Sequence, residues 1–151
     1  MRIIVEILAT GLFTGYCPLF PGTIATILAA LIYWYLLPTN IFIYSIVLLF
    51  SIFIALIVST SAEKRFNNKD DKKIVIDEIV GFWVSLIFLP KTLFVLLIGF
   101  ILFRIFDVFK LPLIKSTQKL AGGIGIVTDD FLAGLLTNII LQVCRIVSVI
   151  K

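Results

Sequence analysis

The chain has 151 residues, the length of one domain, and 61% of them are hydrophobic, with a mean hydropathy of +1.18. A soluble domain of this size cannot bury so much apolar surface, so the composition predicts a membrane protein. The chain has no histidine and 2 cysteines, which excludes histidine–metal sites, Ser–His triads and a disulfide framework. The net charge of +4, without a basic run interleaved with aromatic residues, argues against nucleic-acid binding.

Residues 1–16 are expected to form an amphipathic helix that lies in the membrane interface or re-enters the membrane. Arg2 and Glu6 are four residues apart and therefore share one helical face. Glu6 also interrupts the apolar stretch that a secretory signal peptide would need, and no small-x-small cleavage site precedes Pro18. We therefore expect this segment to remain in the mature protein.

Two irregular segments that contain glycine are candidates for anion binding. In GYCPLFPGT (residues 15–23), two prolines bracket a bend, and Gly22 and Thr23 begin the next apolar segment. The free N–H groups and the hydroxyl at such a helix start can bind a phosphate, although a turn followed by an N-cap explains the same residues. The segment AGGIG (residues 121–125) lacks the lysine of a P-loop and does not by itself predict a phosphate site.

Five apolar segments are predicted to be membrane helices. They are residues 24–37, 41–58, 79–89, 92–103 and 131–150. Their hydrophobicity is continuous rather than alternating, which favours helices over the strands of a barrel. Some are short, since 14 residues of helix cover about 21 Å of a hydrocarbon core that is about 30 Å thick. The predicted fold class is an all-α, polytopic membrane protein with about five membrane helices plus an N-terminal interfacial helix, in a single domain over residues 1–151.

The distribution of cations predicts the orientation of these helices. Residues 59–75 hold five lysine or arginine residues, and residues 104–120 hold four. The connections around residues 38–40 and 90–91 hold one cation between them. By the positive-inside rule the two basic segments face the cytoplasm, which predicts a multi-pass membrane protein with the ends of its helices near these segments on the cytoplasmic side.

Five of the 9 acidic residues lie at or just inside the predicted cytoplasmic ends of apolar segments, and the other four are expected on the solvated surface. The five are Asp77, Glu78, Asp107, Asp129 and Asp130. Carboxylates at such positions are costly and repel one another unless a positive charge lies between them. Since oxygen ligands suit Mg²⁺ or Mn²⁺ rather than zinc, a bound divalent cation is one solution. Structural ion pairs, or acids that complement helix dipoles, are the alternative.

Two side chains are candidates for a positive charge within this group of acids. Arg104, Asp107 and Lys110 follow one another at intervals of three residues and therefore lie along one helical stripe. Both cations are predicted to neutralise an anionic ligand beside the carboxylates.

Small residues accompany two of the acids at helical spacing. Asp77 precedes Gly81 by four residues, and Asp130 precedes Gly134 by four. A small residue one turn away lets a second helix approach closely. The spacing therefore predicts close helix contacts beside the carboxylates.

Four motifs in the order PxxPGT, IDEIVG, FRxFDxxK and GGIGIVTDDFLAG together resemble the phosphatidylglycerophosphatase A family of bacterial membrane lipid phosphatases. The resemblance covers about residues 11–136. It implies Mg²⁺-dependent hydrolysis of the terminal phosphomonoester of phosphatidylglycerophosphate, with phosphatidylglycerol and phosphate as products. It also implies that the five acids form the catalytic and metal-binding core and that Arg104 and Lys110 occupy the family's basic positions.

Metal-assisted phosphomonoester hydrolysis at the cytoplasmic membrane interface is therefore the leading hypothesis. The acids would hold one or two Mg²⁺ ions, and one carboxylate would act as a general base. The substrate phosphate would be bound by Arg104, Lys110 and the N–H groups near Gly22 and Thr23. A lipid-headgroup transferase is one alternative, although the chain lacks the D-x-x-D-G-x-x-A-R core of such enzymes. A cation transporter is another, although its acids would lie near the middle of the membrane.

Overall fold

The computed structural model describes residues 2–68, 71–109 and 122–147. The regular elements of these residues are all helical. In chain order they are α1 (Arg2–Ala9), the 3₁₀ helix η1 (Thr14–Tyr16), α2 (Pro21–Tyr35), α3 (Ile41–Phe66), α4 (Ile76–Leu86), α5 (Leu93–Val108) and α7 (Gly123–Ile146). The all-α prediction is therefore confirmed for the part of the chain that the structure describes.

The starts of three helices follow from local side-chain chemistry. Asn40 caps α3 by accepting hydrogen bonds from the backbone N–H groups of Phe42 and Ile43. Thr92 caps α5 in the same way through the N–H group of Val95. Pro21 is the first residue of α2, a position where its fixed φ and missing N–H group are tolerated. The polar residues between the apolar segments therefore set where these helices begin.

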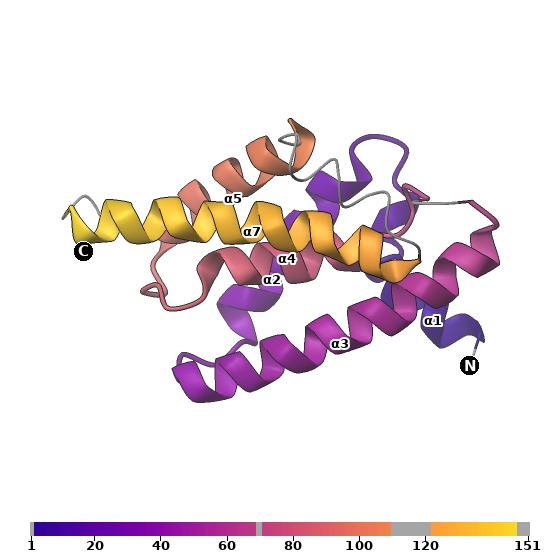
Figure 1. The fold of residues 1–151 in the computed structure, drawn as a ribbon, viewed down its shortest axis with the longest axis horizontal. Helices are drawn as coiled ribbons and strands as arrows, with labels where there is room; N and C mark the ends of the chain where they lie inside the picture. The colour runs from indigo at the N-terminus through magenta and orange to yellow at the C-terminus, as the bar shows by residue number, and fades with distance from the viewer. Residues whose placement is uncertain (1, 69–70, 110–121, 148–151) are drawn as a thin grey trace.

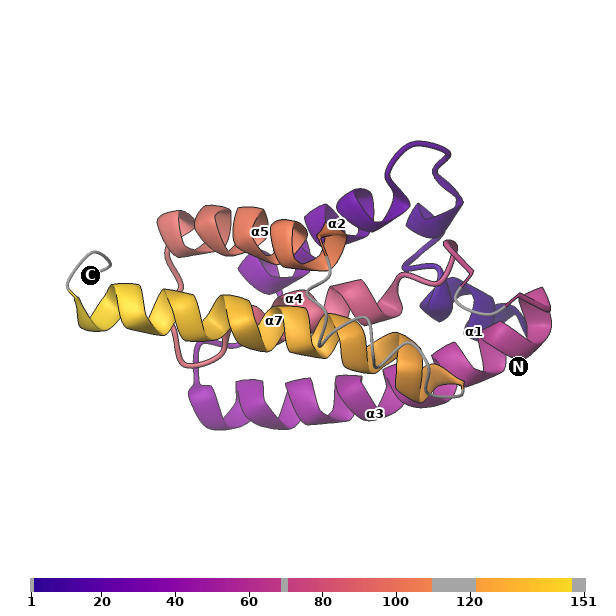
Figure 2. The ribbon, with the colours of Figure 1, turned by 45° about the horizontal axis from the view of Figure 1, so that its top comes forward.

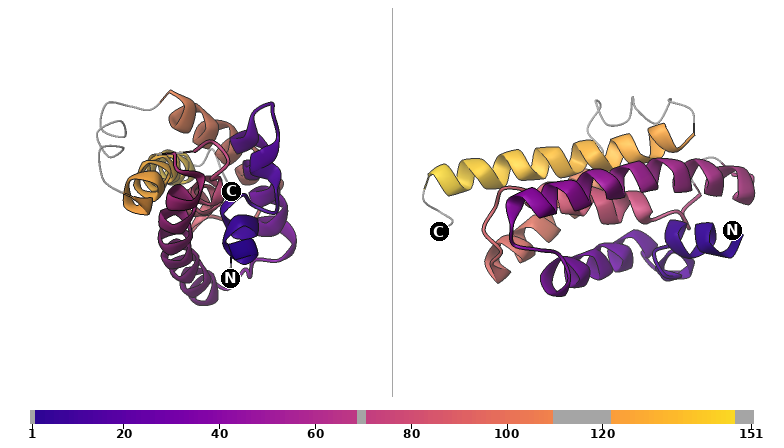
Figure 3. Two further views of the ribbon diagram at one scale, coloured as in Figure 1. Left: turned by 90° about the vertical axis from the view of Figure 1, so that its right-hand side faces the viewer. Right: turned by 90° about the horizontal axis from the view of Figure 1, so that it is seen from below.

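Helix α4 lies at the centre of the molecule. It contacts α2, α3, α5 and α7, and Figures 1 and 2 show α7 and α3 on either side of it. Seen along the length of the molecule, the other helices surround this central position (Figure 3). All but one of the residues of α4 are buried, including Phe82 and Trp83, and the exception is Glu78. This helix forms the core against which the other elements pack.

Glycine permits the tightest contact, which is between α4 and α7. A Cβ atom on Gly81 would lie 2.6 Å from the backbone oxygen of Asp130, and one on Gly134 would collide with the backbone oxygen of Gly81. The two helices therefore meet backbone to backbone, as the spacing of these glycines from Asp77 and Asp130 predicts. The first turn of α4 is held directly against the part of α7 that carries acids.

The expectation of about five membrane helices is wrong. Among the described residues, two helices are long and apolar enough to cross a membrane: α3, with 26 residues, and α7, with 24. Helices α2, α4 and α5 have 15, 11 and 16 residues, and at about 1.5 Å per residue each is shorter than a hydrocarbon core. The apolar segments that end before Pro38 and Pro90, residues 24–37 and 79–89, suggest membrane helices by their composition. The second of these segments instead forms most of α4, which is a buried core helix.

The N-terminal helix is shorter than the helix predicted over residues 1–16. Helix α1 ends at Ala9, and the chain then turns through Gly11, Leu12 and Phe13, all of which have positive φ angles. Glycine adopts this conformation readily, whereas the other two residues require support from the surrounding structure. The turn brings η1 back toward the start of α2, with which it is in contact.

Candidate active site: carboxylates around Arg104

The first turn of α4 supplies two of the acids. Asp77 is 7% exposed, and the side chain of Glu78 is 17% exposed. Acids are favoured in the first turn of a helix because they interact with its unpaired N–H groups and its dipole. This local effect offsets part of the cost of placing two carboxylates in an apolar core.

Arg104 connects α4 with α5. Its Nη1 atom lies 2.6 Å from Asp107 Oδ2, within the same helix, and 3.7 Å from Glu78 Oε1 on α4. The guanidinium side chain is 17% exposed, so solvent screens this ion pair less than a surface pair. Arg104 therefore holds the carboxylates of two helices around one positive charge.

Helix α7 supplies Asp129 and Asp130, each of which is 3% exposed. These residues lie in the second turn of α7, because the helix already begins at Gly123. The expectation that they stand at a helix start is wrong, since glycines 123 and 125 are helical rather than part of a loop. Interaction with the helix dipole is therefore not the reason for these two acids, because that effect fades beyond the first turn.

The five predicted acids belong to one electrostatic cluster. Asp130 interacts with each of the other four carboxylates, which come from α4, α5 and from α7 itself. The described side chains of this carboxylate cluster contain five acids and the single guanidinium of Arg104. Such an excess of negative charge in a largely buried site must be balanced by protons or by bound cations.

The structure describes Arg104, Gly22 and Thr23 among the residues predicted to bind phosphate, but not Lys110. Gly22, at the start of α2, packs directly on the cluster, because a Cβ atom there would collide with Glu78 Oε1 and lie 3.1 Å from Arg104 Nη1. Thr23 is the next residue of α2 and is partly exposed. Lys110 lies outside the described residues. The structure thus brings the start of α2 and Arg104 to the same place.

The chemistry of the cluster fits a hard divalent cation, because every donor is a carboxylate oxygen and the charge is strongly negative. The geometry is not that of a preformed site. Within the described ranges, no three acidic or cysteine side chains converge closely enough to hold a metal ion together. A cation would therefore have to draw these side chains together as it binds.

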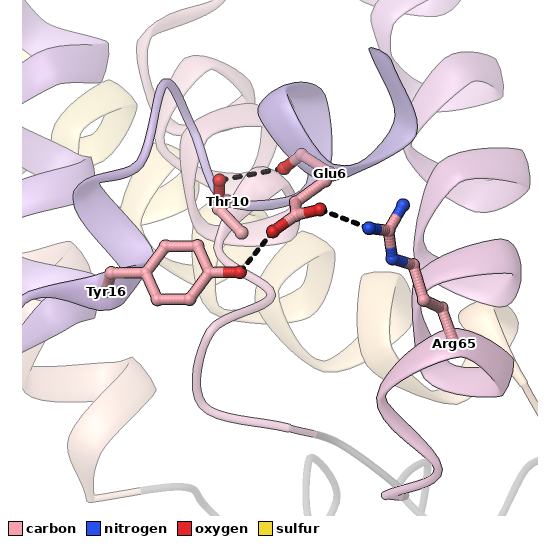
Figure 4. A network of polar contacts seen from close by, with 4 residues as sticks. All are labelled: Glu6, Thr10, Tyr16 and Arg65. Carbon is pink, nitrogen blue, oxygen red and sulfur yellow. Dashed lines mark hydrogen bonds and ion pairs between the residues drawn. The ribbon is translucent and has the colours of Figure 1, made fainter. Parts of the chain in front are cut away.

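A second polar network was not predicted. Figure 4 shows Glu6 of α1 between two partners, since it accepts a hydrogen bond from the Tyr16 hydroxyl and forms an ion pair with Arg65 at the end of α3. Glu6 is therefore a partly exposed residue with two partners, neither of which the sequence analysis identified. The sequence contained one usable signal: a lone acid in an otherwise apolar helix needs a partner. Arg65 is 59 residues away, which is why spacing did not reveal it.

Comparison with known proteins gives consistent results. Residues 7–145 match the family described as Phosphatidylglycerophosphatase A. The chain belongs to this family. A phosphatidylglycerophosphatase A of Escherichia coli K12 is 36% identical over 87% of this chain and 78% of its own length. Another, from Haemophilus influenzae, is 33% identical over 90% of this chain and 85% of its own.

A third relative carries a different name. A Bacteroides thetaiotaomicron protein named "Putative phosphatidylinositol-3-phosphatase" is 31% identical over 92% of both chains. No solved structure gives a significant match. The resemblance identified from the four motifs is thus confirmed, and membership of this family together with the two long apolar helices supports a membrane protein.

Proposed function

We propose that this chain hydrolyses the terminal phosphomonoester of phosphatidylglycerophosphate, with Mg²⁺ as its cofactor, at the cytoplasmic face of the bacterial inner membrane. The reaction consumes one water molecule and yields phosphatidylglycerol and inorganic phosphate. The observation that carries the proposal is the cluster of five largely buried carboxylates, two of which pair with Arg104, in a chain that belongs to the phosphatidylglycerophosphatase A family.

Arg104 is the residue proposed to bind the substrate phosphate. Its guanidinium presents several N–H donors in one plane, a geometry that suits the oxygens of a phosphomonoester. Arg104 lies beside the start of α2. The backbone of Gly22 and the hydroxyl of Thr23 are the polar groups there that could also bind the phosphate. Charge that develops on the phosphate oxygens would be stabilised by such groups if they are aimed at it before the reaction begins.

The carboxylates have two proposed roles. Asp77, Glu78, Asp107, Asp129 and Asp130 are the residues that would hold Mg²⁺. The bound ion would supply Lewis-acid stabilisation of the phosphate and a lowered pKa for water. A carboxylate that is not used for ligation would accept the proton of the attacking water and return a proton to the leaving glycerol oxygen. The apolar surroundings keep bulk water away from this proton transfer.

The proposal is tested by phosphate release from purified protein with short-chain phosphatidylglycerophosphate as substrate. We expect EDTA to abolish release and added Mg²⁺ to restore it. Phosphatidylinositol 3-phosphate serves as the comparison substrate, because both lipids carry a headgroup phosphomonoester. Release that is insensitive to EDTA would remove the metal from the mechanism, and preference for the inositol lipid would replace the proposed substrate.

Variants of the acids test the site separately from the substrate. Asp77→Asn and Asp130→Asn keep the shape of the side chain and remove its charge, and each is expected to lower kcat by at least about 10²-fold. Asp71→Asn is the matched control, because Asp71 lies in the charged segment and hydrogen bonds to Asn68 and the backbone of Lys73. Wild-type turnover by either of the first two variants would contradict the role given to that acid.

A further inference from the structure

A groove between α2 and α5 leads away from the carboxylate cluster. The two helices run in opposite directions, since the start of α2 lies at Arg104 near the end of α5, and the end of α2 lies beside the start of α5. The groove has a volume of about 390 Å³ and lies between the apolar faces of the two helices. Figure 2 shows α2 and α5 adjacent to each other.

One stripe of α5 forms the first wall. Its residues recur every three or four positions, so they share one helical face. They are Leu93, Leu96, Leu97 and Phe100. The next residue in the same stripe is Arg104, four positions beyond Phe100. The apolar wall therefore ends at the guanidinium that is proposed to bind phosphate.

One stripe of α2 forms the second wall with the same spacing. The residues are Ile27, Ala30, Leu31 and Trp34. Four positions before Ile27 the stripe begins with Thr23. The α2 wall thus begins beside Gly22, which packs on the carboxylate cluster, and continues with apolar residues as far as Tyr35 at the far end of the groove.

We infer that this groove binds one acyl chain of the lipid substrate, and that its headgroup phosphate lies at Arg104. The inference rests on the proposed function and specifies where the substrate's hydrocarbon is held. Arg104 lies eleven positions after Leu93 on the helix, which is a length of roughly 16 Å at 1.5 Å per residue. This length matches one leaflet, since the hydrocarbon core of a bilayer is about 30 Å thick.

The exposure of the walls is consistent with a lipid occupant. Leu31 is 52% exposed and Leu97 is 54% exposed, although each faces an apolar neighbour across the groove. A second apolar cavity, of about 290 Å³, includes Ile76, Ile79 and Trp83 of α4. Those residues lie on a face of α4 that is turned away from Asp77 and Glu78 by helical spacing, so an acyl chain there would not lead to the cluster.

The test compares substrates that share one headgroup and differ in their acyl chains. Ala30→Trp and Leu97→Trp fill the groove, and Leu49→Trp adds the same bulk on α3, where Leu49 is 67% exposed. In detergent, each groove variant is expected to lower kcat/KM about tenfold for dioleoyl-phosphatidylglycerophosphate, the loss expected when contacts of about two methylenes disappear. Values for the dihexanoyl substrate should stay within about twofold of wild type, as should both values for Leu49→Trp.

Several outcomes would overturn the inference while leaving the proposed function intact. One is that the groove variants keep the wild-type kcat/KM for both substrates, and another is that they lose it equally for both. A third is that Leu49→Trp also loses kcat/KM for the long-chain substrate alone. If the wild-type protein hydrolyses neither substrate, the proposed function itself fails. Thermal unfolding of each variant shows whether it is folded.

A binding measurement tests the same groove without turnover. Trp34 fluorescence is isolated as the difference between Asp77→Asn and Asp77→Asn combined with Trp34→Phe, both in nanodiscs. Phosphatidylglycerophosphate with brominated chains should quench this signal more strongly than brominated phosphatidylcholine at the same mole fraction. Equal quenching by the two lipids would overturn the inference, because the groove would then hold bulk lipid.

Discussion

At the scale of single residues, Arg104 has the largest electrostatic role in the described part of the site. It lies between Glu78 and Asp107 and is the one cation of the cluster that the structure describes. We expect Arg104→Gln to lower kcat/KM by about 10²-fold, because the described part of the carboxylate cluster then has no positive side chain to bind the phosphate. Arg104→Lys should recover part of this loss, since lysine restores the charge but not the planar donor geometry.

The matched control for this change is Arg145→Gln. Arg145 is at the opposite end of the molecule, where its Nη1 atom donates a hydrogen bond to the Phe88 carbonyl oxygen at 2.9 Å. This variant loses the same charge but should keep the kcat/KM of the wild type. If both arginine variants lose activity equally, the effect of Arg104 is one of general stability and not of phosphate binding.

Tyr16 reports on the polar network at α1. The hydrogen bond to the Glu6 carboxylate raises the pKa of Tyr16 above its usual value of 10.0, with smaller contributions from burial and from the negative charge of Glu6. A raised pKa means that the contact stabilises the fold below the usual value and that this stabilisation is lost as pH rises through the raised pKa. We expect Glu6→Ala to return the pKa of Tyr16 toward 10.

Phenolate absorbance during an alkaline titration measures this pKa, with Tyr16→Phe subtracted to remove the other tyrosines. Arg65 lowers the pKa of Tyr16 through its positive charge, so Arg65→Gln should raise the titration midpoint further. An unchanged titration of Tyr16 in Glu6→Ala would show that the network in Figure 4 does not form in solution.

At the scale of elements, the contact between α4 and α7 depends on glycine. We expect Gly134→Ala to lower the free energy of unfolding by about 1–3 kcal/mol, because the new methyl group would meet the backbone oxygen of Gly81 and the helices would have to separate. Gly99→Ala is the control, since its methyl group would lie 2.9 Å from Leu86 Cδ2, the end of a side chain that can move. Thermal unfolding in detergent should show a clearly larger loss for Gly134→Ala than for Gly99→Ala.

The sequence predicted the helices but not all of their roles. Apolar periodicity and the prolines placed most elements, whereas the start of α7 was placed eight residues too late, at residue 131 instead of Gly123. The error arose because Gly123 and Gly125 look like loop residues, yet Gly123 packs against Leu56 and Thr60 of α3 where no side chain fits. Tertiary packing overrode the low helix propensity of glycine.

The grouping of the acids was predicted more completely than the membrane topology. Acids at the ends of separate apolar segments stand out in a sequence because placing a carboxylate there costs free energy, which suggests a functional site. The fold brings three of them, Asp77, Asp107 and Asp130, into one cluster. The burial of α4 could not be recognised, because a helix that is apolar all round looks the same in a protein core and in lipid. The long-range pair of Glu6 and Arg65 was missed for a similar reason, since distant residues leave no periodic pattern.

At the scale of the whole molecule, the two helices that are long and apolar enough to cross a membrane, α3 and α7, lie against each other. The N–H group of Gly123, at the start of α7, donates a hydrogen bond to the Thr60 hydroxyl near the end of α3 at 3.0 Å, so the two helices run in opposite directions. At the other end, Arg145 of α7 contacts Phe88, and Lys91 contacts the Leu37 carbonyl oxygen just before α3. The carboxylate cluster therefore lies toward the end of the molecule where α3 finishes.

This arrangement predicts on which side of the membrane three engineered cysteines lie. Thr39→Cys and Val147→Cys flank the far ends of α3 and α7, and Asn68→Cys follows the basic end of α3. All three positions are exposed, and the native Cys17 and Cys144 are replaced by serine. The positive-inside rule predicts that the end of α3 with Lys64 and Arg65 is cytoplasmic. A membrane-impermeant maleimide should then label Thr39→Cys and Val147→Cys in spheroplasts, and Asn68→Cys only after permeabilisation. Labelling of Thr39→Cys and Asn68→Cys from the same side would mean that α3 does not cross the membrane. The reverse pattern would place the carboxylate cluster on the outer face and would contradict the proposed cytoplasmic location of the site.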